Sequence, residues 1–130
     1  MRVLIVEDEF TSRRLLQRIL SSYGDCDIAV DGKEALEAFS LAYEQGEAYD
    51  LVCLDIMMPE MDGREVLKAI RRNERERGIT GLDGVKVIMT TAVRDSENIM
   101  GSFSDGCEGY ILKPIDKAKI LRQLRELGLI

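Results

Sequence analysis

Five short apolar runs alternate with helix-like segments along this chain, and this alternation constrains the fold more than any other feature. The third run is apolar without interruption from Leu51 to Leu54, which is typical of a strand buried on both faces of a sheet. Strands that alternate with helices form a parallel sheet with helices on both sides, and 130 residues suit one domain. The sequence therefore predicts a single α/β domain with strands at 3–6, 26–30, 49–55, 85–91 and 109–112.

Apolar residues at helical spacing and well-placed capping residues predict helices between these strands. The first apolar stripe consists of Leu15, Leu16, Ile19, Leu20 and Tyr23. We expect Gly24 to end this helix in the C′ position. Four aspartates are predicted to begin the later helices, the first two with a glutamate three residues on: Asp31, Asp62, Asp95 and Asp116.

Two charged stretches are expected to lie in solvent. The helix that starts at Asp62 runs into the sequence RRNERERG, so residues 71–77 are predicted to be a solvated helix end before a loop at 79–84. The helix that starts at Asp95 is expected to end near Gly106. Most of the basic residues of the last helix are also expected to be solvated: Lys117, Lys119, Arg122 and Arg125.

Composition and charge exclude several classes of function. The net charge is −6 and the basic residues are spread along the chain, so direct nucleic-acid binding is not expected. The apolar runs are too short to span a bilayer, and the N-terminus MRVLIVEDE turns acidic too early for an export signal, which predicts a cytoplasmic protein. The chain has no histidine, which excludes His-based triads and a phosphohistidine carrier. Three separated cysteines are expected to be free thiols: Cys26, Cys53 and Cys107.

Polar residues follow four of the predicted strands at the point where each strand ends. In an open α/β sheet, ligands bind at the carboxyl ends of the strands. A single acidic residue after a strand is most often a helix cap or a loop residue, so the joint placement carries the argument. The residues delivered to this edge are Glu7, Asp8, Asp55, Thr90, Thr91 and Lys113.

The charges at this edge indicate a magnesium-assisted phosphoryl-transfer site. Glu7, Asp8 and Asp55 bring three negative charges against the single positive charge of Lys113. Carboxylates that lie close together stay ionised only when a cation joins them, and a few oxygen ligands beside an open position suit Mg²⁺. Aspartate is a nucleophile in such chemistry and forms an aspartyl phosphate.

Residues 2–127 resemble the receiver domain of a two-component response regulator, of the CheY-like kind. The resemblance rests on the segments VLIVEDE, DLVCLDIMMPEMDG, VIMTTA and GYILKP, in this order and at these spacings. It implies a (βα)5 flavodoxin-like three-layer sandwich with a parallel five-stranded sheet of order 2-1-3-4-5. We expect residues 1–130 to form one stand-alone receiver domain without an output domain, which is a signalling domain and not an enzyme.

The resemblance also implies roles for individual residues. Asp55 matches the phosphoacceptor, Asp8 the direct ligand of Mg²⁺ (or Mn²⁺), and Glu7 its neighbour, often linked through water. The backbone carbonyl of Met57 matches a further metal ligand. Three residues match the switch and phosphate-binding positions: Thr91, Tyr110 and Lys113. The Lys113–Pro114 bond is expected to be cis.

The implied partners are a sensor histidine kinase or phosphotransfer protein that donates the phosphoryl group, and a downstream protein effector. Phosphorylation is expected to change the partner affinity of the face formed by the fourth helix, fifth strand and fifth helix, in a monomer or weak dimer. Met57 and Val93 match positions that flank the path of attacking water in receivers. Neither side chain can activate water, so we hypothesise a long-lived aspartyl phosphate; simple packing roles are the competing interpretation.

Two other classes of protein remain as alternatives. A phosphatase with an aspartyl nucleophile typically carries a second aspartate two positions after the first, where this chain has Met57. A pseudo-receiver would only bind partners, and the complete set of Asp8, Asp55, Thr91 and Lys113 argues against it. Incubation with acetyl phosphate and Mg²⁺ distinguishes a receiver from both.

Overall fold

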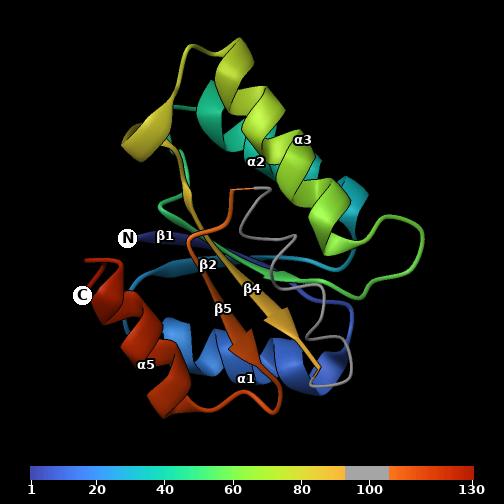
Figure 1. Ribbon diagram of the computed structural model, residues 1–130, viewed down its shortest axis with the longest axis vertical. Coiled ribbons are helices and arrows are strands. Elements are labelled where there is room, and N and C mark those ends of the chain that lie inside the picture. The colour runs from blue at the N-terminus through green and yellow to red at the C-terminus, as the bar shows by residue number, and fades with distance from the viewer. Residues whose placement is uncertain (93–105) are drawn as a thin grey trace.

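The computed structural model describes residues 1–92 and 106–130, and its centre is a five-stranded sheet (Figure 1). All neighbouring strands are parallel, and their order is β2-β1-β3-β4-β5, which confirms the predicted topology. The strands are β1 (Arg2–Val6), β2 (Asp25–Ala29), β3 (Leu51–Asp55), β4 (Lys86–Thr91) and β5 (Gly109–Leu112).

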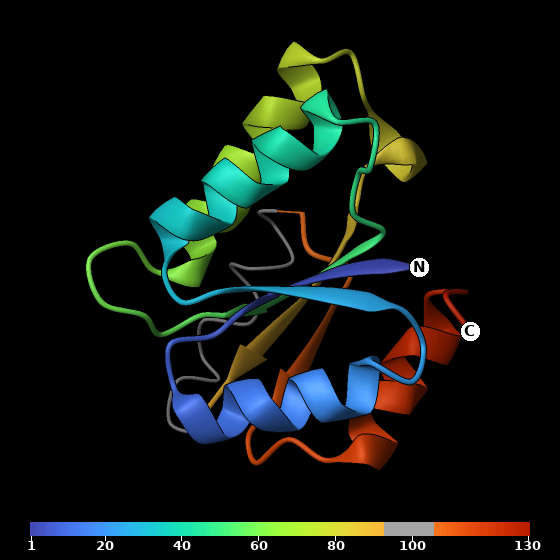
Figure 2. The same ribbon diagram turned by 180° about the vertical axis from the view of Figure 1, so that it is seen from behind.

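Helices cover both faces of the sheet and make three layers (Figures 1 and 2). Helices α1 (Phe10–Leu20) and α5 (Lys117–Glu126) lie on one face. Helices α2 (Gly32–Glu44) and α3 (Gly63–Glu76) lie on the other. As predicted, Asp31, Asp62 and Asp116 are N-caps whose side chains accept hydrogen bonds from the first turn. The helix predicted to start at Asp95 falls outside the described residues.

The central strand β3 is buried along its whole length. Val52 and Leu54 pack towards α2 and α3, whereas Leu51 and Cys53 pack towards α1 and α5. Burying each large apolar side chain contributes about 1.5–3 kcal/mol to folding, so both cores fix the position of this strand. Asp55 is its last residue, and the strand therefore holds that carboxylate at the carboxyl edge of the sheet.

The structure corrects the predicted ends of several elements. Strand β3 begins at Leu51 and not at residue 49. The Tyr49 side chain packs at this end, where its hydroxyl donates a hydrogen bond to Asp27 at 2.7 Å. Strand β2 covers Asp25–Ala29, so Val30 lies outside it. The predicted loop at 79–84 contains one short 3-10 helix, Gly81–Asp83. The cysteines are free thiols, as expected.

The prediction that Gly24 ends the first helix in the C′ position is wrong. Helix α1 ends at Leu20, and Ser21 is its C-cap in right-handed conformation. Gly24 lies where the chain passes Met1, and the Asp25 N–H donates to the Met1 carbonyl at 3.0 Å. A Cβ on Gly24 would collide with that carbonyl, so a glycine is required here by close packing and not by the helix end.

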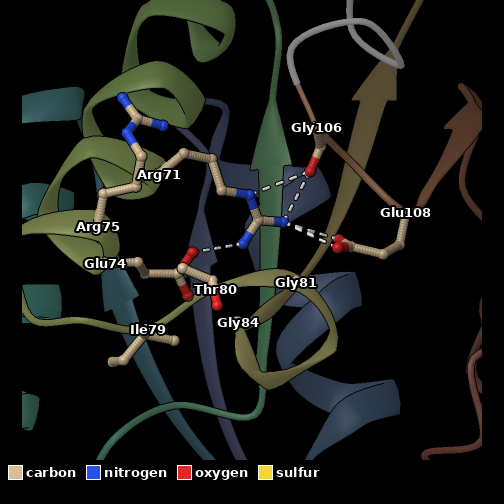
Figure 3. A pocket seen from close by; sticks show the side chains of 9 residues that line it. All are labelled: Arg71, Glu74, Arg75, Ile79, Thr80, Gly81, Gly84, Gly106 and Glu108. Atoms are coloured by element: carbon tan, nitrogen blue, oxygen red, sulfur yellow. Dashed lines mark hydrogen bonds and ion pairs between the residues drawn. The ribbon is translucent and has the colours of Figure 1, made fainter.

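The predicted solvated end of the third helix is also wrong for Arg71 and Glu74. Glu74 is only 3% exposed, and its carboxylate accepts hydrogen bonds from the Val85 N–H at 2.7 Å and from Arg71 at 2.8 Å. The Arg71 guanidinium also donates to the Glu108 carboxylate and to the Gly106 carbonyl (Figure 3). We call these contacts of Arg71 with Glu74, Glu108 and the Gly106 carbonyl the Arg71 clasp. Its residues line a cavity of about 450 Å³, and it joins α3 to the segments directly before β4 and β5.

Candidate functional site

Four charged side chains at the ends of three strands, β1, β3 and β5, meet at the carboxyl edge of the sheet. Glu7 and Asp8 directly follow β1, Asp55 ends β3, and Lys113 directly follows β5. The Glu7 N–H donates to the Ala29 carbonyl at 3.1 Å, which continues the pairing of β1 with β2 and fixes the start of this loop. The sequence placed these four residues together at this edge, and the structure confirms that placement.

The three carboxylates form a compact cluster. One oxygen of each of Glu7, Asp8 and Asp55 lies within 4.8 Å of the others. Glu7 is fully buried, Asp55 is 3% exposed, and Asp8 faces solvent. Carboxylate oxygens in this number, with one open side, fit a hard divalent cation that keeps several waters. The donor set therefore fits Mg²⁺, with solvent access provided on the side of Asp8.

Lys113 supplies the positive charge that faces the two buried carboxylates. Its Nζ lies 2.8 Å from Glu7 Oε1 and 3.4 Å from Asp55 Oδ1. Burial alone would lower the pKa of Lys113, but the hydrogen bond to Glu7 and the charge of Asp55 raise it. The ammonium is therefore held in its charged form. The Lys113–Pro114 bond is cis, as the resemblance implied.

One ammonium does not balance the negative charge around Asp55. Burial, followed by the hydrogen bond and the charge of Glu7, raises the pKa of Asp55 from 3.8 to about 8, although Lys113 and the Met57 N–H act in the opposite direction. Like charges in a desolvated place favour protonation of one partner unless a cation intervenes. The raised pKa of Asp55 therefore agrees with the geometry in fitting a bound divalent cation.

The loop after β3 packs tightly against the backbone of Asp55. The Met57 N–H donates to Asp55 Oδ1 at 3.3 Å, and the Gly63 N–H donates to the Ile56 carbonyl at 2.8 Å. A Cβ on Gly63 would collide with the Asp55 carbonyl. Glycine at the start of α3 therefore allows the helix to approach the end of β3. The Met57 side chain is 51% exposed beside this edge.

The chain matches the response regulator receiver domain family over residues 3–125. It belongs to that family. Receiver domains are signalling domains of two-component systems, in which phosphorylation by a histidine kinase is typical, and they typically bind Mg²⁺ at an acidic pocket. In this chain, Glu7, Asp8 and Asp55 form an acidic cluster at the carboxyl edge of the sheet.

Individual relatives agree with this assignment. The chain is 33% identical over 128 residues to hybrid signal transduction histidine kinase L of Dictyostelium discoideum, covering 98% of this chain and 7% of the kinase. It is 32% identical to response regulator ArlR of Staphylococcus saprophyticus, covering 97% of this chain and 51% of that protein. The chain thus spans at most about half the length of these curated relatives.

A solved structure with the same fold is the CheX–CheY–BeF3–Mg²⁺ complex from Borrelia burgdorferi. The two chains are 30% identical, and the TM-score is 0.83 with coverage of 98% of this chain and 89% of that one. Within residues 1–92 and 106–130, no helix of this receiver is both long and apolar enough to cross a membrane.

The expected switch residues of the receiver lie on β4 and β5. Thr91 is fully buried at the end of β4, and its hydroxyl donates to the Ala92 carbonyl at 3.3 Å. The Thr91 carbonyl accepts the Lys113 N–H at 2.7 Å, so the two strand ends are joined. Tyr110 is half-buried on β5 and packs against the core under α2 and α3. Val93, the second predicted neighbour of the water path, lies outside the described residues.

Sequence reasoning missed two basic residues that hold the loops of this edge. Arg13 donates to the carbonyls of Glu7 at 3.2 Å and Asp8 at 3.4 Å. Lys119, expected to be solvated, instead bonds the Leu112 and Pro114 carbonyls. Both side chains donate hydrogen bonds to backbone carbonyl oxygens of a nearby loop. The helical spacing of apolar residues shows only that Arg13 and Lys119 lie outside the apolar face of their helices. The sequence therefore carried no specific signal for either contact.

Proposed function

We propose that this receiver accepts a phosphoryl group on Asp55 from the phosphohistidine of a partner kinase or phosphotransfer protein. The observation that carries the proposal is the meeting of Glu7, Asp8 and Asp55 within 4.8 Å, with Lys113 in contact with two of them. The relative from Borrelia burgdorferi, in a complex with BeF3 and Mg²⁺, supports it.

In the transfer, a carboxylate oxygen of Asp55 attacks phosphorus as the bond from phosphorus to the histidine nitrogen breaks. The electron pair of that bond stays on the nitrogen, and the product is an acyl phosphate on Asp55. Glu7, Asp8, Asp55 and the Met57 carbonyl would hold Mg²⁺ (or Mn²⁺), which supplies charge neutralisation for the transferred group. Lys113 would pair with a phosphoryl oxygen as it now pairs with Asp55.

The readout would follow from the added charge. Phosphorylation replaces one negative charge on Asp55 by about two. Thr91 and Lys113 would turn to the phosphoryl oxygens, and Tyr110 would turn inward. The surface of β5, α5 and the helix predicted after Asp95 would then change its affinity for a protein effector. We expect this to occur in the cytoplasm, in a monomer or weak dimer that does not itself bind nucleic acid.

Incubation with acetyl phosphate and Mg²⁺, followed by intact-protein mass spectrometry, tests this proposal. Wild type should gain one phosphoryl group, and Asp55→Asn should gain none. Asp83→Asn is the matched control, because Asp83 is an exposed aspartate of the short 3-10 helix. Rapid release of phosphate without labelled protein would indicate a phosphatase instead. Absence of both label and turnover would indicate a pseudo-receiver.

A further inference from the structure

Lys119 lies in the first turn of α5, close in sequence to the phosphate-binding Lys113. Its Nζ donates to the Leu112 carbonyl at 3.1 Å and to the Pro114 carbonyl at 2.9 Å. These two carbonyls belong to the residues on either side of Lys113. The ammonium of Lys119 thus bridges the backbone around Lys113, which directly follows β5 and contacts the buried carboxylates of Glu7 and Asp55.

Lys119 is itself held firmly by the helix it belongs to. Its backbone N–H donates to Asp116 Oδ1 at 2.8 Å, which is the N-cap bond of α5. The neighbouring Ile120 is fully buried in the core below the sheet. A side chain that starts from a fixed helical turn and makes two charge-assisted hydrogen bonds can hold a loop in one conformation.

The segment around Lys113 needs such support because β5 is an edge strand. Among the strands of residues 1–92 and 106–130, β4 alone pairs with β5, and just beyond the end of β5 the Lys113 N–H donates to the Thr91 carbonyl at 2.7 Å. That bond fixes one side of the Lys113 backbone. The two hydrogen bonds from Lys119 hold the carbonyls of the residues before and after Lys113. Together these bonds fix the backbone of Lys113 and so the direction in which its side chain points.

We infer that Lys119 is a positioning residue that fixes Lys113 for phosphoryl transfer to Asp55. The inference rests on the proposed function. Lys119 acts through the backbone and through Lys113, and it does not touch the reacting atoms. A small displacement of a group that pairs with the transferred phosphoryl can reduce the rate strongly, by up to about 100-fold for 1 Å.

The test compares Lys119→Met with Lys117→Met in the rate of phosphorylation by acetyl phosphate with Mg²⁺. Both changes remove one positive charge from the first turn of α5, and Lys117 is exposed. We expect Lys119→Met to slow phosphorylation about tenfold and Lys117→Met to change it less than about twofold. Lys119→Arg can still bridge two carbonyls and should recover most of the rate.

Two further measurements separate positioning from general damage. The Mg²⁺ dissociation constant, measured by calorimetry, should change less than about twofold in Lys119→Met, because Lys113 is not a metal ligand. In a Lys113→Met background, Lys119→Met should have almost no additional effect on the rate, since the two residues act as one unit. Should Lys119→Met fold poorly, Lys119→Gln provides the same comparison.

Each outcome has a definite meaning. Equal rates for Lys119→Met and Lys117→Met would overturn the inference, and so would a full additional loss in the Lys113→Met background. A parallel loss of Mg²⁺ affinity would also overturn it, because the change would then have disturbed the whole edge. Wild-type protein that takes up no phosphoryl group would instead overturn the proposed function on which the inference rests.

Discussion

Removing the charge of Asp55 should stabilise the metal-free protein. Asp55 is 3% exposed and lies against the fully buried Glu7. Its pKa rises from 3.8 to about 8 on folding, mainly because of burial and then because of Glu7. At pH 7 only the interval between the unfolded pKa of 3.8 and the pH counts. This interval is about three pH units, at about 1.4 kcal/mol each, and it lowers the free energy of unfolding by about 4 kcal/mol. Since a buried amide has its own cost, we expect Asp55→Asn to recover about 2–4 kcal/mol.

The pH dependence of this effect is fixed by the direction of the shift. Below about pH 4, Asp55 binds a proton in both the folded and the unfolded chain, so wild type and Asp55→Asn should be similarly stable. Between about pH 4 and pH 8 the unfolded chain releases this proton while the folded chain retains it. Wild type should therefore lose stability relative to Asp55→Asn across this range, and the difference should level off above it.

Urea unfolding followed by circular dichroism, with EDTA present, measures this difference at several pH values. Asp83→Asn serves as the control, because it removes a charge from an exposed aspartate. Mg²⁺ should stabilise wild type clearly more than Asp55→Asn, since it relieves the same repulsion. The reasoning is refuted if Asp55→Asn is no more stable than wild type at neutral pH without metal, or if the difference does not grow with pH.

Three further changes test other parts of the structure. Arg71→Met leaves the buried Glu74 carboxylate without its cation and should lower the free energy of unfolding, measured in urea, by about 3–5 kcal/mol. Arg75→Met, at an exposed site on the same helix, should lower it by less than about 0.5 kcal/mol. Equal effects would contradict the role of the Arg71 clasp. Gly63→Ala forces a Cβ against the backbone of Asp55, so unfolding should cost about 1–3 kcal/mol less and labelling by acetyl phosphate should slow. An unchanged rate would show that the loop adjusts freely. Met57→Asn offers a polar group to attacking water and should shorten the lifetime of the aspartyl phosphate about fivefold or more, and an unaltered lifetime would favour a simple packing role.

The order of elements and the polar edge were predictable because their signals are local. Four strands coincide with short apolar runs, whereas β2 (DCDIA) does so only at its end. Strand β3 is predicted to be buried on both faces because Leu51 to Leu54 are all apolar. The residue that ends a strand follows directly from the strand itself. Asp55 and Lys113 could therefore be placed at one edge before any contact was known, and the structure brings them to 3.4 Å.

The features that sequence reasoning missed depend on contacts between distant segments. The helical pattern predicts a solvated Glu74, but its carboxylate is buried where it accepts hydrogen bonds from Arg71 and from the Val85 N–H, 11 residues later. Arg71 pairs with Glu108, which lies 37 residues later in the sequence. A glycine is required at position 24 because the Met1 backbone lies close to it, and the spacing of residues in a helix cannot predict this approach. Contacts between distant segments decide which charged residues become buried. The spacing of residues within one helix carries no information about such contacts.

The central claim is that Asp55 is the phosphoryl acceptor, and chemical trapping tests it most directly. Protein incubated with acetyl phosphate and Mg²⁺ is treated with borohydride, which reduces an acyl phosphate to an alcohol, and the peptides are then sequenced by mass spectrometry. The account predicts that Asp55, in the segment LVCLDIMMPEMDG, is converted to homoserine, and that this product is missing when Mg²⁺ is withheld. Conversion of another carboxylate, with Asp55 left intact, would contradict the account.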